Sequence, residues 1–101
     1  MKTQTEILEG KRLTKHQKNV LGLISGENCY ILEIFDINEV KTSYIITNGE
    51  DDIEDVRELT MKKLKSFDFM RSQILPSSDR IIRTKHFIPE ELKVKVYLAL
   101  C

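Results

Sequence analysis

The feature that most constrains this fold is a pair of strand-like segments that ends in an Asn-Gly turn. Residues 29 to 37 are rich in aromatic and β-branched residues, and residues 40 to 47 form a second segment of the same kind. Asn48-Gly49 follows directly, and this dipeptide readily adopts the backbone conformations that a tight turn requires. The two segments, which are separated by the polar Asn38-Glu39, therefore predict a β-hairpin in the first half of the chain, and Asn48-Gly49 is expected to end its second strand.

A helix is predicted before this hairpin. Residues 15 to 25 follow Thr14, whose side chain can cap a helix, and they place Val20, Leu21 and Ile24 on one face.

A second helix is predicted after the hairpin, over residues 52 to 66, with acidic residues at its start and lysines near its end, as the helix dipole favours. A break near residues 58 and 59, which would give two short helices with Thr60 as the second cap, fits the same pattern. The apolar stripe of this segment has the 3.6-residue period of a helix and consists of Ile53, Val56, Thr60, Leu64 and Phe67.

The last third of the chain predicts a second hairpin and a short helix. Residues 69 to 75 and 80 to 87 have extended character and flank a polar turn that begins with Pro76. Pro89 favours the first turn of a C-terminal helix, although residues 93 to 97 alternate like a strand and predict one as the alternative.

These elements define an α+β protein with one domain over residues 13 to 101 and an N-terminal arm over residues 1 to 12. A chain of 101 residues is long enough for one hydrophobic core. The core is expected to contain the apolar residues on the inner faces of the elements, namely Val20, Leu21, Ile24, Ile31, Ile46, Val56, Leu64, Phe67 and Ile82.

Charge is segregated along the chain even though the 16 basic and 16 acidic residues cancel overall. Residues 27 to 55 contain nine acidic residues and one basic residue, whereas residues 57 to 85 contain eight basic and three acidic ones. Because salt screens charges beyond about 8 Å, each segment can present its own local field to a partner.

The residues needed for known catalytic or metal chemistry are not gathered in any recognisable motif. Cys29 and Cys101 are far apart and predict reduced thiols, and His16 and His86 are expected to be surface residues. Motifs for nucleotide binding, nucleophilic catalysis or zinc are missing from the sequence. We therefore expect a protein that is not an enzyme and needs no cofactor or metal. A long apolar segment and a secretory signal are also missing, which predicts a cytoplasmic protein with no membrane partner.

Part of the sequence resembles the winged-helix DNA-binding superfamily. The resemblance rests on Leu13-Thr14-Lys15-x-Gln17-x-x-Val20-Leu21, on Leu59-Thr60-x-x-x-Leu64-x-x-Phe67, and on the hairpin that follows, and it covers roughly residues 13 to 87. The hairpin over residues 30 to 47 departs from the family pattern, which often has a helix there.

The resemblance implies a small winged-helix-like domain that binds duplex DNA, such as a transcriptional or mobile-element regulator. In that family a late helix enters the major groove and a hairpin called the wing contacts the backbone or the minor groove. By position, the helix would contribute Lys62, Lys63 and Lys65, and the wing would contribute Arg71, Arg80, Arg83 and Lys85.

The acidic segment supports an alternative from a different functional class. Glu50, Asp51, Asp52 and Asp55 form a dense cluster of carboxylates, which predicts a protein-binding module or a small inhibitor that docks on a basic partner surface. The edges of the predicted hairpins would also permit strand addition by a partner. The sequence leaves both alternatives open and does not define the oligomeric state.

Overall fold

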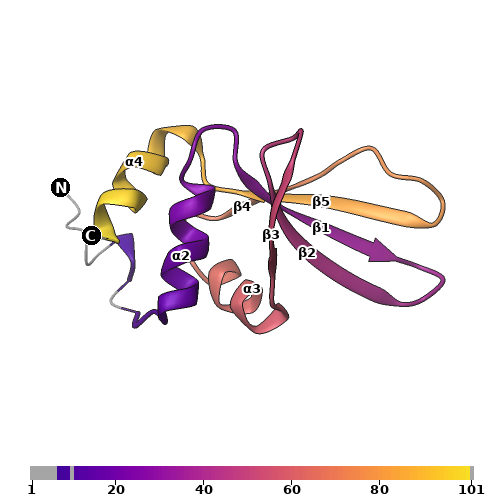
Figure 1. Cartoon of the computed structure of the whole chain (residues 1–101), viewed down its shortest axis with the longest axis horizontal. Helices are drawn as coiled ribbons and strands as arrows, with labels where there is room; N and C mark the ends of the chain where they lie inside the picture. Colours follow the sequence, from indigo (N-terminus) through magenta and orange to yellow (C-terminus); the bar gives the residue numbers. More distant parts are fainter. Residues whose placement is uncertain (1–6, 10, 101) are drawn as a thin grey trace.

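The computed structural model describes residues 7 to 9 and 11 to 100, and its helices lie at one end of a long, twisted sheet (Figure 1). In chain order the elements are α2 (Lys15–Ile24), β1 (Tyr30–Asp36), β2 (Lys41–Thr47), β3 (Asp52–Val56), α3 (Glu58–Lys65), β4 (Arg71–Ile74), β5 (Ile81–Phe87) and α4 (Glu90–Ala99). The α+β class, both predicted hairpins and the C-terminal helix are confirmed.

All five strands belong to one antiparallel sheet with the order β3-β2-β1-β5-β4. β1 is the central strand, and it pairs with β2 on one side and with β5 on the other. α3 carries the chain from β3 at one edge to β4 at the opposite edge.

The two faces of the sheet have different surroundings. The helix face carries Ile31 and Ile46, which are fully buried in a core shared with α2 and α3. On the opposite face, which we call the open face, the side chains of β1, β2 and β5 all keep part of their surface exposed, except Thr47. Side chains alternate between faces along a strand, so this difference follows directly from the register.

The start of α2 has the geometry that the sequence predicted. The Thr14 hydroxyl accepts the Gln17 backbone N–H at 3.1 Å, and the Gln17 side chain accepts the Thr14 backbone N–H at 2.9 Å. These two hydrogen bonds form a capping box and satisfy backbone donors that a helix start leaves unpaired.

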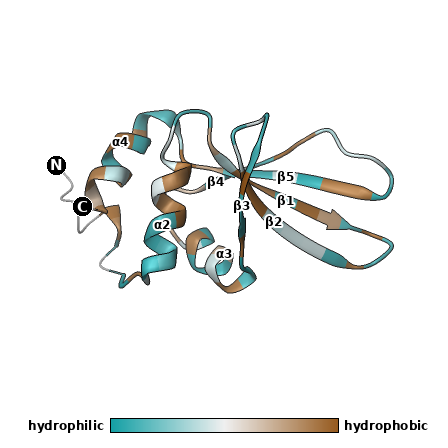
Figure 2. Cartoon of the chain, in the orientation of Figure 1, coloured by the Kyte–Doolittle hydropathy of each residue, from teal (hydrophilic) through white to brown (hydrophobic). Residues whose placement is uncertain are grey.

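The predicted core is confirmed with one exception, because eight of its nine residues are buried and Ile82 is 38% exposed. Ile82 pairs with Phe35 in a part of the sheet that extends beyond the helices. Figure 2 shows hydrophobic residues along these projecting ends of β1 and β5. Because the strands extend beyond the helices, the molecule is elongated, with extents of 45 × 23 × 21 Å.

The helix predicted over residues 52 to 66 is wrong in its first part. Residues 52 to 56 form β3, which pairs with β2 so that Val56 lies opposite Tyr44. The Asn48-Gly49 turn brings the segment back along β2, with Gly49 at φ +95°. Pairing with β2 therefore overrides the helical period, and Ile53 is 44% exposed. α3 begins at Glu58, close to the break that fitted the sequence.

The winged-helix arrangement is not confirmed by this order of elements, which has a single five-stranded sheet. Within the described ranges, no helix has the length and apolar character needed to cross a membrane. Residues 1 to 6 and 10 of the predicted arm, and Cys101, lie outside the described residues. Ile7 and Leu8 of that arm pack against the core, and Cys29 is a half-buried free thiol.

Leu64→Ala tests the packing of α3 against the sheet. Leu64 is fully buried, so loss of its side chain should lower the free energy of unfolding by about 2 to 5 kcal/mol. Leu59, in the same helix, is 79% exposed, and Leu59→Ala should change stability by no more than about 0.5 kcal/mol. Urea unfolding of both variants makes the comparison, and equal effects would contradict the packing.

Candidate nucleic-acid interface

Two aromatic rings and a lysine meet on the open face. Tyr30 and Lys85 project there from β1 and β5, the two central neighbours of the sheet, together with Phe87. The Lys85 ammonium lies 4.7 Å from the centre of the Tyr30 ring and 5.1 Å from that of Phe87. An ammonium at this distance from a ring face is attracted by the negative face of the π-system. The contact holds the lysine over both rings.

Arg71 and Arg83 lie on the same face as this cluster. Arg71 pairs with Phe87 across β4 and β5, and Arg83 stands two residues before Lys85 on β5. Both side chains are exposed, and the Arg71 guanidinium donates to the carbonyl oxygens of Asp68 and Met70. Three of the predicted wing residues therefore share the open face with two aromatic rings.

A cavity of about 400 Å³ lies where the open face meets the helical end of the molecule. Its walls come from three separate connections, the α2–β1 loop, the β2–β3 turn and the start of α4. The lining residues are Asn28, Cys29, Tyr30, Asn48, Lys85, Phe87, Ile88, Glu90 and Lys93.

The predicted helix lysines do not join this surface. All three lysines, Lys62, Lys63 and Lys65, are carried by α3, and this helix packs on the helix face of the sheet. The Lys65 ammonium lies 3.3 Å from a Glu33 carboxylate oxygen and over the Tyr44 ring. Its charge is therefore partly compensated within the protein.

Arg80 is also engaged within the protein, at the projecting end of the sheet. Its guanidinium binds Asp36 at 3.1 Å and lies 3.9 Å from Glu39. The hydrogen bonds from Arg80 hold the pKa of Asp36 below its usual value, because they stabilise the carboxylate. Arg80 is thus a less available anion contact than Arg83.

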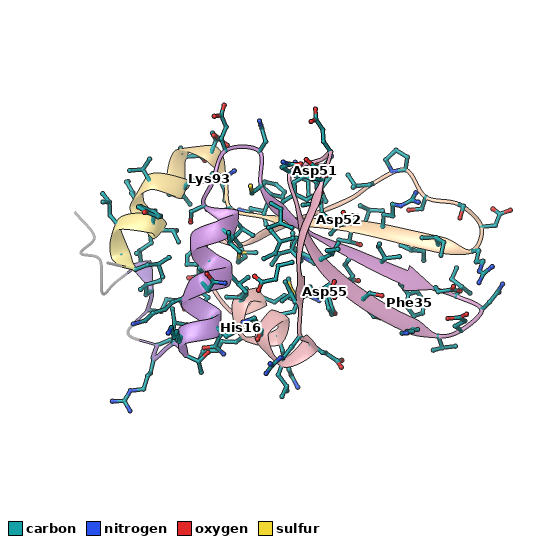
Figure 3. All side chains as sticks on the ribbon, in the orientation of Figure 1. His16, Phe35, Asp51, Asp52, Asp55 and Lys93 are labelled. Carbon is teal, nitrogen blue, oxygen red and sulfur yellow. The ribbon has the colours of Figure 1, made fainter. Side chains whose placement is uncertain are left out.

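The predicted acidic residues form one exposed edge of the sheet. Asp52 and Asp55 belong to edge strand β3, and Glu50 and Asp51 stand in the turn before it. Figure 3 shows Asp51, Asp52 and Asp55 spaced along this edge. We call this surface the acidic edge. Asn48 orders its turn, since the Asn48 side-chain oxygen accepts the backbone N–H groups of Glu50 and Asp51 at 2.9 and 2.8 Å.

A buried polar network on the helix face was not predicted. His86 is 4% exposed, which corrects its expected surface position. Its Nδ1 lies 2.7 Å from the Ser72 hydroxyl, and its Nε2 lies 2.8 Å from a Glu33 carboxylate oxygen. The network connects β4, β5 and β1 and satisfies a buried imidazole. Only the strand register could have revealed it, because the three residues are far apart in sequence.

Burial raises the pKa of Glu33, but hydrogen bonds from His86 and Lys65 lower it more, and the net pKa is below the ordinary value of 4.5. The folded state therefore favours the carboxylate over its protonated form. Among the described residues, no three His, Cys, Asp or Glu side chains are grouped so that they could hold a metal ion.

Comparison with known proteins adds no family assignment: no family model, curated protein or solved structure matches this chain.

Glu33→Gln tests the polar network. A lowered folded-state pKa contributes stability that is complete above the unfolded value near 4.5 and is lost as pH falls through the folded-state pKa. The variant should therefore have a lower urea midpoint than the wild type at neutral pH, and the difference should shrink as pH falls below 4.5. Glu27→Gln, in an exposed loop, provides the baseline. A difference that stays constant with pH would contradict the assignment.

Proposed function

We propose that this protein is a non-catalytic nucleic-acid-binding domain that takes single-stranded nucleic acid on its open face. The observation that carries the proposal is the Lys85 ammonium held over the rings of Tyr30 and Phe87 on the central strands. Proteins that bind single strands combine cations for the phosphates with aromatic side chains on which bases stack. This face presents both.

Lys85 can bind a phosphate and also make the two rings available for base stacking if its ammonium moves off them. In the free protein its ammonium covers the two rings, and a phosphate would draw it away from them. An unpaired base could then stack where the ammonium had been, so the cation–π contact would be exchanged for base stacking and an ion pair. Arg71 and Arg83 would supply further phosphate contacts from the same face.

Single strands are favoured over a duplex by the shape of this surface. Bases inside a duplex are stacked on one another and cannot reach Tyr30 or Phe87, whereas unpaired bases can. The lysines predicted for a major-groove helix are carried by α3, which lies on the face of the sheet opposite to this surface.

Lys85→Ala and Tyr30→Leu separate the two parts of the interface. Loss of one phosphate contact should reduce the magnitude of the log-affinity against log-salt slope by about 0.7 for a single strand, so Lys85→Ala should flatten it. Tyr30→Leu should weaken binding by about 1 to 3 kcal/mol while leaving the slope almost unchanged. Fluorescence anisotropy with labelled single-stranded DNA measures both quantities.

Lys62→Ala is the matched control, because Lys62 is an exposed lysine on α3. It should leave affinity and slope close to the wild-type values, and thermal melts verify that each variant folds. Equal losses for Lys62→Ala and Lys85→Ala would mean that binding is diffuse, and no wild-type binding at about 50 mM salt would overturn the proposal. Tighter binding to a duplex would overturn the preference for single strands.

A second candidate function is supported by the acidic edge. Glu50, Asp51, Asp52 and Asp55 are all exposed, and β3 is an edge strand with no neighbouring strand on its outer side among the residues that the structure describes. Such a strand can pair with an extended segment of a partner, and its carboxylates favour a partner rich in lysine or arginine. The acidic edge would then act as a protein-binding surface on the β3 side of the sheet, three strands away from β5, which carries Lys85.

The triple variant Asp51→Asn, Asp52→Asn, Asp55→Asn tests this second function. It should abolish binding of a lysine-rich peptide, measured by calorimetry, because the attraction to the acidic edge is removed, and it should not weaken single-strand binding. Glu27→Gln with Glu91→Gln, two exposed carboxylates elsewhere, serves as the control. Peptide binding that both variants reduce equally would show a general effect of net charge.

A further inference from the structure

We infer that the cavity at the end of the open face holds the terminal nucleotide of a bound single strand, an inference that rests on the proposed function. The cavity shares Tyr30, Lys85 and Phe87 with the open face, so a strand lying along that face leads into it. Its volume of about 400 Å³ lies within the usual range for small-ligand pockets.

The position of the cavity favours a strand end over an internal nucleotide. Three connections wall it, and they carry Asn28, Asn48 and Glu90. The opposite end of the sheet projects beyond the helices (Figure 1), so a strand can leave in that direction. At the other end, the start of α4 and the α2–β1 loop form walls of the cavity.

The walls are held together in the absence of a ligand. The Lys93 ammonium is almost buried, donates to the Gly26 carbonyl at 2.8 Å and lies 3.5 Å from Glu90. These contacts fasten α4 to the α2–β1 loop, and Figure 3 shows Lys93 at this junction. A preformed pocket loses less entropy when it binds a ligand.

Two carboxamides and Lys85 in the cavity lining suit a nucleotide, and the charge of Glu90 is partly compensated by Lys93 at 3.5 Å. The side-chain oxygen of Asn48 already accepts two backbone N–H groups, which leaves its N–H groups to face a ligand. Asn28 adds a second carboxamide from a backbone with φ +63°. Carboxamides pair with the edges of bases, and Lys85 can bind the phosphate of the same nucleotide while Tyr30 or Phe87 stacks on its base.

The decisive experiment compares linear and circular single-stranded DNA of the same length and sequence. A circle has no end and lacks the contacts of a terminal nucleotide with Asn28 and Asn48, so the linear strand should bind about tenfold more tightly. Adenosine monophosphate should compete with both strands, because Tyr30, Lys85 and Phe87 belong to the cavity and to the open face alike.

Asn28→Asp tests the cavity directly, because aspartate tolerates the same backbone conformation but replaces the carboxamide N–H donors with a negative charge inside the cavity. It should lower linear-strand affinity to that of the circle and leave circle binding unchanged, whereas Asn38→Asp in the exposed β1–β2 turn should change neither. Equal wild-type affinities for both strands would overturn the terminal pocket and leave the proposed function intact. Failure of both strands to bind would overturn both proposals.

Discussion

The sheet and its two surfaces depend on the pairing of β1 with a neighbour on each side. Its alternation places Ile31 and Glu33 on the helix face and Tyr30 and Leu32 on the open face. The same strand therefore contributes to the core, to the buried polar network and to the proposed binding surface. A shift of the register by one residue would exchange these sets, burying Tyr30 and exposing Ile31.

The register is fixed by the hydrogen bonds of the buried network as well as by the burial of apolar side chains. His86 can satisfy both ring nitrogens only when Ser72 and Glu33 occupy the same face of the neighbouring strands. A slipped register would leave a buried imidazole without partners, which costs about 1 to 3 kcal/mol for each unsatisfied group. The network therefore also positions the open face, because residues 85 and 87 flank His86 on the same strand.

Signals contained within a few residues were reliable guides to the structure, and those that required pairing were not. Thr14 and Gln17 specify the start of α2 locally, and Asn48-Gly49 specifies the turn between β2 and β3. The helical period of Ile53 and Val56 contained no sign that residues 52 to 56 would pair with β2 as a strand. The basic residues were found by composition, but only their alternation along β5 separates Arg83 and Lys85 from the lysines of α3.

The topology also explains how a chain with no net charge can attract an anion. α3 carries the chain across the sheet, so the acidic edge on β3 and the basic residues of β4 and β5 lie on opposite sides of β1. Strands are spaced about 4.8 Å apart, which puts β5 roughly 14 Å from β3, three strands away. This distance exceeds the screening length of about 8 Å at physiological salt. A phosphate near Arg83 on β5 would therefore experience mainly the local basic residues, while Asp55 would repel phosphates from the β3 side and confine a strand to β1, β5 and β4.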